Sequence, residues 1–280
     1  MPPPILYLGP EGTHSHDAAR RRFGARARLL PCLSHYEIFA RLCAARGRIR
    51  PLAVVPVENS SEGPVTQTLD QLAHHPRVTI LDSFSLPVQQ HLLARPGTTL
   101  ARIRRVCSHP QALGQCRATL ARLRPKAELI PESSTSAAAR RAAQEDGTAA
   151  IASETAARLH GLAVLRPDVQ DGGENVTRFF TLSADAAARP RRAKDAELRS
   201  LIHLVIGNRP GALLHVLAPF DASGVNLTFI QSRPLPGRPW EYGFFIEAVT
   251  DWKSAPARAA WKMVCALSES GRKIGTYPVG

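Results

Sequence analysis

The sequence predicts an α/β protein in two parts. From residue 5 to about residue 180, short apolar segments that read as strands alternate with segments of helical periodicity, which favours an α/β region with a largely parallel sheet. Between residues 183 and 199 the pattern fades into Ala, Arg and Pro, as in a surface linker. A shorter pattern of strands and helices follows, and 280 residues suit two or three cores.

In the first part, each expected strand runs into a polar loop and then a helix. Strands are expected at residues 5–8, 52–57, 106–108, 149–152 and 175–180. Helices are expected from Ser15, across Val65, Leu69 and Leu72, across 113–123, across 133–145, and from Ser153. This repeat of strand, loop and helix start predicts several helix N-termini at one edge of a sheet.

The second part has its own order of elements. Strands are expected at residues 201–206, 225–230, 240–249 and 274–277, with helices at 211–220 and 255–267. The order βαββαβ predicts a ferredoxin-like sandwich. Because a unit of roughly 80 residues has a small core, edge-to-edge pairing of two copies would cover its exposed sheet.

The composition is that of a soluble globular protein, with 44% hydrophobic and 21% charged residues. A net charge of +13 would ordinarily suggest nucleic acid or an acidic membrane surface as a partner. However, Arg supplies almost all of the positive charge, the arginines are scattered, and no aromatic residues lie among them to stack on bases. A small anionic substrate accounts for the charge equally well, so neither nucleic acid nor membrane is expected.

Other sequence features exclude further classes. The five cysteines show no metal-ligand spacing and their odd number argues against a full set of disulfides, so buried free thiols are expected. The N-terminus leads directly into a strand without a signal-peptide pattern, and no apolar run is long enough to cross a membrane. A cytoplasmic protein without a metal is the expectation.

Polar side chains follow the expected strands, where α/β proteins form their crevice. Four segments occupy such places: Gly12-Thr13-His14-Ser15, Glu58-Asn59-Ser60, Ser108-His109-Pro110-Gln111 with Gln115, and Thr177-Arg178. Any one of them could be an ordinary helix cap, since Ser is a common N-cap residue. Together they supply many neutral hydrogen-bond donors and one Arg, with little besides Glu58 to repel an anion. The set therefore predicts an anion-binding cleft.

The segment from Asn175 to Phe180 is the most informative of these. It places the Thr177 hydroxyl beside the Arg178 guanidinium, between apolar strand residues. Neighbouring side chains on a strand point to opposite faces, so both would serve one cleft only if the strand ends or twists there. Taken alone, the segment also fits an edge strand with a solvated Arg.

Over nearly its whole length, the chain resembles monofunctional prephenate dehydratases with a C-terminal ACT regulatory domain. The resemblance is carried by four stretches in the family's order and spacing: Gly9-Pro10-Glu11-Gly12-Thr13 with Ser15, Pro56-Val57-Glu58-Asn59-Ser60 with Gly63, Val65 and Thr68-Leu69-Asp70, Ser108-His109-Pro110-Gln111-Ala112-Leu113 with Gln115-Cys116, and Asn175-Val176-Thr177-Arg178-Phe179. Gly211-Ala212-Leu213 and the stretch from Asn226-Leu227 to Gln231-Ser232-Arg233-Pro234 resemble the family's phenylalanine-sensing motifs.

The resemblance implies a fold and its limits. A two-lobed catalytic domain like the periplasmic binding proteins, with a cleft, would span residues 1–183. One lobe would contain 1–80 with 168–183, and the other 81–167. A linker would span 184–198, and a ferredoxin-like ACT domain 199–280.

The family's reaction removes the ring carboxylate of prephenate as carbon dioxide and the ring hydroxyl as water, which gives phenylpyruvate without a cofactor. By resemblance, the catalytic residues are Thr177, Glu58, Asn59, Ser108 and Gln115. The substrate-binding residues are Thr13, Ser15, Ser60 and Arg178. Thr177 would hydrogen-bond or protonate the leaving hydroxyl. Arg178 would bind a carboxylate, with a structural ion pair as a nearly equal alternative.

Phenylalanine would bind between paired ACT domains of a homodimer or homotetramer. By resemblance, its contacts are Gly211, Ala212, Leu213, Asn226, Leu227, Gln231, Ser232 and Arg233. The chain departs from the family at two positions: His14 stands where an aromatic residue is usual, and Gln231 where Glu is usual. His14 would either stack as a polar aromatic or add a proton-dependent charge near the substrate. The loss of a carboxylate at Gln231 could weaken effector coupling.

Three alternatives remain open. The substrate could be arogenate, which bears an amino group in place of the keto group of prephenate. The chain could be a catalytically silent amino-acid sensor, although the joint presence of Thr177, Arg178, Asn59 and Gln115 argues against silence. Nucleic-acid binding through the basic surface lacks a motif.

Overall fold

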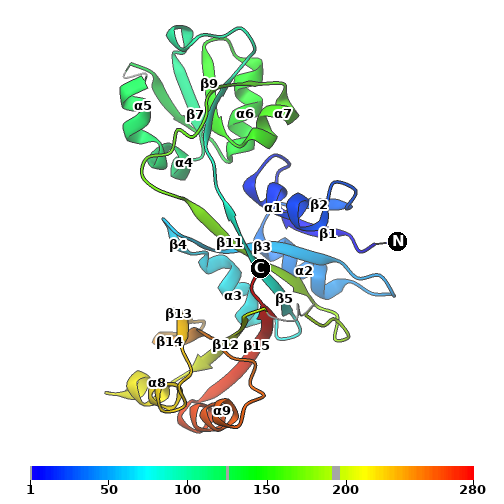
Figure 1. Cartoon of the computed structure of the whole chain (residues 1–280), viewed down its shortest axis with the longest axis vertical. Coiled ribbons are helices and arrows are strands. Elements are labelled where there is room, and N and C mark those ends of the chain that lie inside the picture. The colour runs from blue at the N-terminus through cyan, green and yellow to red at the C-terminus, as the bar shows by residue number, and fades with distance from the viewer. Residues whose placement is uncertain (1, 124–125, 191–195) are drawn as a thin grey trace. The chain divides into compact units, whose positions relative to one another are not determined.

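The computed structural model describes residues 2–123, 126–190 and 196–280 (Figure 1). The described part of the chain contains three β-sheets with helices packed on them, which confirms the α/β prediction. It forms two compact units, each described by itself. Unit 1 consists of Met1–Ile38, Asn59–Ser61 and Leu86–Thr177, and unit 2 of Phe39–Glu58, Glu62–Ser85 and Arg178–Gly280. The predicted linker 184–198 includes residues 191–195, which lie outside the described residues, and the domain limits stay a prediction.

Unit 1 contains most of the first strands and helices. Its elements are β1 (Ile5–Leu8), α1 (His14–Phe23), β2 (Leu29–Cys32), β6 (His91–Ala94), a 3-10 turn (Leu100–Arg102), β7 (Arg105–Ser108), α4 (Pro110–Gln115), α5 (Arg117–Leu123), β8 (Glu128–Pro131), α6 (Thr135–Gln144), β9 (Thr148–Ala152), α7 (Glu154–His160) and β10 (Ala163–Arg166). Four further elements contain the positions at which the chain passes from one unit to the other. They are α2 (His35–Ala44), β3 (Leu52–Asn59), β5 (Thr79–Pro87) and β11 (Val176–Ser183).

The five-stranded sheet of unit 1 has the order β10-β6-β9-β7-β8 and helices on both faces (Figure 1). Successive strand residues point to opposite faces: Val106 and Ile151 pack with the side chains of α4 and α5, whereas Cys107 and Ala150 pack with those of α6 and α7. β7 is parallel to β8 and β9, but β6 and β10 are antiparallel to their neighbours. This sheet is therefore mixed: β7, β8, β9 and β10 run in one direction and β6 runs against them.

The helix expected across residues 113–123 is divided into α4 and α5 at Cys116. The carboxylate of Asp171 accepts hydrogen bonds from the backbone N–H groups of Ala118 (2.6 Å) and Thr119 (2.7 Å). It thereby satisfies two N–H groups that the first turn of a helix leaves without intrahelical partners. A cap supplied from a distant segment leaves no local signal in the sequence.

Unit 2 contains the second part of the chain together with β4 (Gly63–Pro64) and α3 (Thr66–His74). The C-terminal elements are β12 (Leu198–Val205), α8 (Ala212–Ala222), β13 (Leu227–Leu235), β14 (Arg238–Ala248), α9 (Ala255–Leu267) and β15 (Ser270–Pro278). Their sheet has the order β13-β14-β12-β15, with antiparallel pairing throughout. α8 and α9 cover one face (Figure 1) and share a core with Ile202, Leu204 and Ile246. The predicted ferredoxin-like sandwich is confirmed, and β13 lies at an edge.

The other face of this four-stranded sheet meets α3 within unit 2. Arg233 of β13 binds Asp70 of α3 through two hydrogen bonds of 2.7 Å. Arg272 of β15 donates to the backbone oxygens of Leu72 and Ala73 near the end of α3, where a cation also complements the helix dipole.

Candidate functional site

The Thr177 side chain lies in a chain of neutral hydrogen bonds within unit 1. Thr177 is the second residue of β11 and only 8% exposed. The amide of Asn59, at the end of β3, donates to the Thr177 hydroxyl oxygen (2.8 Å) and to the Asn175 side-chain oxygen (2.6 Å). Asn175 in turn donates to the side-chain oxygen of Gln115 (3.1 Å). We call these four residues the Thr177 network.

The direction of these bonds decides what Thr177 can do. A hydroxyl group has one proton to donate and two lone pairs that accept. Because Thr177 accepts from Asn59, its own proton remains available for donation to another acceptor. The network carries no formal charge, so it orients Thr177 without repelling an anion.

Ser60 and Ser108 have different surroundings. Ser60 exchanges two 2.9 Å hydrogen bonds with the backbone of Val176, one through its backbone N–H and one through its hydroxyl oxygen. The fully buried Ser108 hydroxyl donates to the backbone oxygen of Ile151 (2.6 Å). Both hydroxyls therefore contact the backbone. Of the predicted catalytic residues, Asn59, Gln115 and Thr177 share the network.

Thr13 caps α1 and fixes the loop that precedes it. Its side-chain oxygen accepts from the backbone N–H of His16 (3.3 Å), and its hydroxyl contacts the backbone oxygens of Leu8 (3.1 Å) and Pro10 (3.0 Å). The helix begins at His14, one residue before the expected Ser15, which is buried in the first turn.

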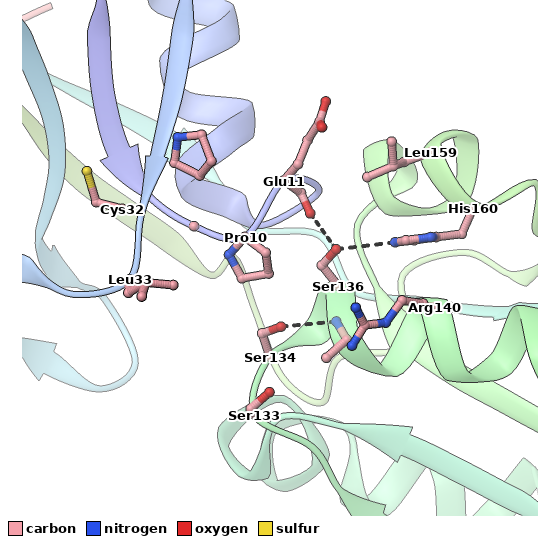
Figure 2. Close-up of a pocket in the computed structure, with 13 residues that line it drawn as sticks. Pro10, Glu11, Cys32, Leu33, Ser133, Ser134, Ser136, Arg140, Leu159 and His160 are labelled. Carbon is pink, nitrogen blue, oxygen red and sulfur yellow. Dashed lines mark hydrogen bonds between the residues drawn. The ribbon is translucent and has the colours of Figure 1, made fainter.

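The loop from Gly9 to Thr13 is also attached to α6 and α7. The Ser136 hydroxyl donates to the backbone oxygen of Glu11, and Figure 2 shows Ser136 between Glu11 and His160. The Ser153 hydroxyl donates to the backbone oxygen of Gly12 (3.2 Å). Gly12 has φ +86°, and a Cβ there would lie 2.7 Å from the Ser136 hydroxyl, so this close approach requires Gly.

A cavity of about 640 Å³ lies beside this loop. Its lining includes Pro10, Glu11, Ser134, Arg140 and His160 (Figure 2). None of the predicted catalytic or substrate-binding residues lines this cavity.

His14 lies beside Gln90. Its Nε2 lies 3.3 Å from the side-chain nitrogen of Gln90. Burial lowers the pKa of His14 below its usual value, although Asp17 and Gln90 act in the opposite direction. Of the two readings open for His14, a polar aromatic residue fits this environment better than a charge near pH 7.

Arg178 and Glu58 lie in a charged group within unit 2. One terminal nitrogen of Arg178 binds both carboxylate oxygens of Glu247 (2.7 and 2.9 Å), and the other contacts Glu58 (3.0 Å). Arg199 also donates to Glu247 (3.0 Å), as do the hydroxyls of Thr228 and Tyr277 (2.6 Å each). We call these six residues the Glu247 cluster. Its ion pairs occupy both terminal nitrogens of Arg178, and Nε is buried without a hydrogen-bond partner among the described residues, which favours the structural alternative for Arg178 over carboxylate binding.

Burial and charge oppose each other at Glu247, which has no exposed surface. Burial alone would raise the pKa of Glu247, but Arg178 and the hydrogen bonds from Thr228 and Tyr277 outweigh it and lower the pKa below its usual value. The Tyr277 pKa is raised, first by burial and then by Glu247, so its hydroxyl remains a donor.

The predicted effector residues lie on α8 and β13. Gly211 adopts a left-handed conformation (φ 78°) directly before α8, in which Ala212 and Leu213 are the first residues. Asn226 precedes β13, and Leu227, Gln231, Ser232 and Arg233 belong to that strand. The Gln231 amide donates to the backbone oxygen of Ser232 (2.8 Å). The guanidinium of Arg233 is engaged by Asp70.

Metal ligands and disulfides are not part of the described structure. Among the described residues, no group of three or more His, Cys, Asp or Glu side chains could hold a metal ion. The five cysteines are free thiols; Cys32, Cys107 and Cys116 are buried, as predicted, whereas Cys43 and Cys265 are half-buried. Within residues 2–123, 126–190 and 196–280, helices are too short or too polar to cross a membrane.

Five residues of these sites were not among the predicted site residues. Asn175 links Asn59 to Gln115, and its place in the motif that contains Thr177 was the available signal. Glu247, Arg199, Thr228 and Tyr277 gave none, because they belong to strands far along the chain from Arg178.

Comparisons with known proteins agree with this architecture. The family model described as Prephenate dehydratase matches residues 5–187. The bifunctional chorismate mutase/prephenate dehydratase of Stutzerimonas stutzeri is 35% identical over 274 residues, which cover 98% of this chain and 73% of that protein. The prephenate dehydratase of Mycolicibacterium vanbaalenii is 32% identical over 291 residues, covering 99% of this chain and 92% of that one.

A solved structure is similar over nearly the same length. The prephenate dehydratase of Arthrobacter aurescens, crystallised in complex with L-Phe, has 33% sequence identity and a TM-score of 0.87, with coverage of 98% of this chain and 89% of that one.

Proposed function

Because the chain belongs to the prephenate dehydratase family, we propose how its residues convert prephenate to phenylpyruvate. In this lyase reaction the ring loses a carboxylate as carbon dioxide and a hydroxyl as water. We assign Thr177 as the group that donates a hydrogen bond to the departing hydroxyl. The observation that carries the assignment is the 2.8 Å hydrogen bond in which Thr177 accepts from Asn59, since it leaves the Thr177 proton for the substrate.

A Thr hydroxyl is a weak acid, so its contribution is a positioned hydrogen bond. Donation to the leaving oxygen in the transition state is typically worth about 10²–10⁴ in rate. Such a gain requires that the donor is oriented before the substrate arrives. Asn59, Asn175 and Gln115 supply this orientation in the proposal, each through a neutral amide.

The remaining predicted residues take supporting roles. We assign Ser60 and Ser108 to the backbone around the network, since both hydroxyls contact backbone atoms. Thr13 and Ser15 would shape the start of α1 for the substrate. Glu58 and Arg178 are assigned to the structural ion pair, which fits their 3.0 Å contact.

We also propose that phenylalanine regulates the protein through the C-terminal domain, residues 199–280. Gly211, Ala212, Leu213, Asn226, Leu227, Gln231 and Ser232 are the proposed contacts. The complex of the Arthrobacter relative with L-Phe supports this effector. Arg233 is assigned to anchoring, because Asp70 occupies its guanidinium. The edge strand β13 would pair with a second copy in a homodimer or homotetramer, and the protein would be cytoplasmic.

One assay tests the catalytic assignment. Purified protein is mixed with prephenate, and phenylpyruvate is followed by its ultraviolet absorbance, with arogenate as the comparison substrate. Thr177→Ala should lower kcat about a hundredfold or more with little change in KM, while Thr177→Ser, which keeps the hydroxyl, should retain most activity. Near-normal turnover by Thr177→Ala would remove Thr177 from its role. Faster turnover of arogenate than of prephenate would identify arogenate as the preferred substrate. No turnover of either compound would favour a catalytically silent amino-acid sensor.

Calorimetry tests the effector. Phenylalanine is titrated into the full chain and into a Gln231→Glu variant, which restores the family's residue. Binding by the full chain is expected, and tighter binding by the variant would assign the departure at Gln231 to the effector site. Absence of heat in both would contradict phenylalanine as the effector.

A further inference from the structure

Glu247 joins all four strands of the C-terminal sheet to the strand that carries Thr177. Within the Glu247 cluster, Glu247 belongs to β14, Arg199 to β12, Thr228 to β13 and Tyr277 to β15. The fourth partner of Glu247, Arg178, belongs to β11. The carboxylate therefore receives a hydrogen bond from each of the other three strands of its own sheet as well as from Arg178.

Arg178 is held on several sides. Besides Glu247 and Glu58, its guanidinium carbon lies 5.7 Å from the centre of the Phe180 ring and 5.9 Å from that of Phe229, distances at which cation–π attraction operates. The Arg178 side chain is 12% exposed and that of Glu247 is 0% exposed. A buried charge that loses its partner is strongly destabilised, so the position of Arg178 depends on the Glu247 carboxylate.

Thr177 precedes Arg178 directly in β11, and their backbones share one peptide group. A catalytic donor must stay within roughly 0.5 Å of its productive position. Movement of about 1 Å caused by a remote substitution can cost about a hundredfold in rate. The Glu247 cluster is thus placed to fix the strand end from which Thr177 acts.

We propose that Glu247 is a positioning residue for the dehydration step, acting through Arg178 on Thr177. The inference rests on the role proposed for Thr177. It assigns a task in catalysis to a residue beyond position 187, where the match to the family model ends.

The test measures kcat and KM for prephenate in Glu247→Gln, which keeps the size of the side chain and removes its charge. We expect kcat to fall about tenfold to a hundredfold with KM within about threefold. Measurement is made at a temperature at which circular dichroism shows the variant fully folded. The matched control is Glu241→Gln on the same strand, where the carboxylate pairs with the half-exposed Arg238; kcat there should stay near the wild-type value.

A double-mutant cycle separates positioning from general damage. If Glu247 acts through Arg178, the variant Glu247→Gln/Arg178→Gln should lose little more kcat than Arg178→Gln alone. The proposal would be overturned if the double variant lost kcat by the product of the two single losses, or if folded Glu247→Gln kept an unchanged kcat. If Glu247→Gln does not fold, Glu247→Asp takes its place, because it keeps the charge but shortens the side chain by one methylene. A normal kcat in Glu247→Asp would overturn the proposal equally.

Thr177→Ala is measured in the same assay. Near-normal activity of Thr177→Ala would reject the proposed catalytic role, whatever Glu247→Gln does. A large loss in Thr177→Ala together with normal kcat in Glu247→Gln would reject the positioning role alone.

Discussion

The Thr177 network and the Glu247 cluster each take one residue from β3 and one from β11, at successive positions, yet they differ in charge. In β3, Glu58 belongs to the cluster and Asn59 to the network; in β11, Arg178 belongs to the cluster and Thr177 to the network. The network consists of amides and a hydroxyl joined by bonds of 2.6–3.1 Å. The cluster combines ion pairs of Arg178 and Arg199 with hydrogen bonds from the hydroxyls of Thr228 and Tyr277, and the fully buried carboxylate of Glu247 takes part in most of them.

The difference shows how neighbouring residues of β11 can have different tasks: Arg178 forms stabilising ion pairs, and Thr177 is the proposed donor to the substrate. Charged groups pair with one another in the cluster. Both terminal nitrogens of Arg178 are occupied and its Nε is buried with no hydrogen-bond partner in the described part of the chain, so little of their hydrogen-bonding capacity is accessible to a ligand. Neutral groups in the network orient a hydroxyl and leave its proton available. Arg178, for which carboxylate binding and a structural ion pair were nearly equal alternatives from the sequence, forms ion pairs with Glu247 and Glu58.

The largest expected effect is the loss of stability when an ion pair of the Glu247 cluster is removed. Arg178→Met leaves the buried Glu247 with Arg199 as its one remaining guanidinium partner among the described residues. The free energy of unfolding should fall by about 3–5 kcal/mol, the usual loss when one partner of a buried ion pair is removed. Urea denaturation measures it. The control Arg238→Met breaks half-exposed pairs with Glu241 and Glu269 and should cost about 1 kcal/mol or less. Equal losses in the two variants would contradict the distinction.

Removing a hydrogen-bond donor from the Thr177 network should lower the reaction rate more than the stability of the fold. Asn59→Leu, of similar size, removes the donor to both Thr177 and Asn175. We expect kcat for prephenate to fall about tenfold to a hundredfold, since an unoriented donor loses its advantage. The control is Asn208→Leu in the exposed loop before α8. A wild-type kcat in Asn59→Leu would show that Thr177 needs no such orientation.

Lowering the pH should reduce the free energy of unfolding through the Glu247 cluster, by less than Arg178→Met does. Glu247 has a lowered pKa in the folded chain, against about 4.3 when unfolded. The folded state therefore binds fewer protons, and the stability that Glu247 contributes is complete above about pH 4.3 and is lost as pH falls through the lower folded pKa. Urea titrations at pH 7 down to pH 3 should show a steeper decline for the wild type than for Glu247→Gln. Parallel curves would assign acid unfolding to other groups.

The smallest effect is expected at His14. Because burial lowers the pKa of His14 below its usual value, we expect the imidazole to carry no charge at pH 7. His14→Phe should therefore change kcat by less than about threefold and leave the profile of kcat/KM between pH 6 and 8 unaltered. Disappearance of an ionisation near pH 6.5 in the variant would mean that a charged His14 takes part in substrate binding.

Much of the fold followed from local patterns in the sequence. Strands such as residues 5–8 and 149–152 were marked by apolar runs, and the βαββαβ order of the second part was complete. The break at Cys116 could not be predicted, because Asp171, far along the chain, supplies the cap that starts α5. The direction of β6, which runs against the other four strands of its sheet, likewise depends on how distant segments enter the sheet.

For the site, residue type was a better guide than residue role. The loops after the strands indicated Asn59, Gln115 and Thr177, which the structure brings into one network. The sequence could not distinguish Arg178 as a ligand-binding group from Arg178 as an ion-pair partner, because the deciding carboxylate, Glu247, enters from a strand of the C-terminal sheet. Hydrogen-bond direction, which makes Thr177 an acceptor from Asn59, is equally a property of three-dimensional arrangement.

The burial of Glu247 limits how freely this protein could be recombined with its relatives. A chimera joined at the end of the family match would exchange the carboxylate while keeping the arginine that it neutralises. A C-terminal domain taken from a relative should therefore be compatible where that relative has an acidic residue at the position of Glu247. Without one, Arg178 would be buried without this partner, next to Thr177 in β11. The ion pair between Arg178 and Glu247 thus joins residues on either side of position 187, where the family match ends.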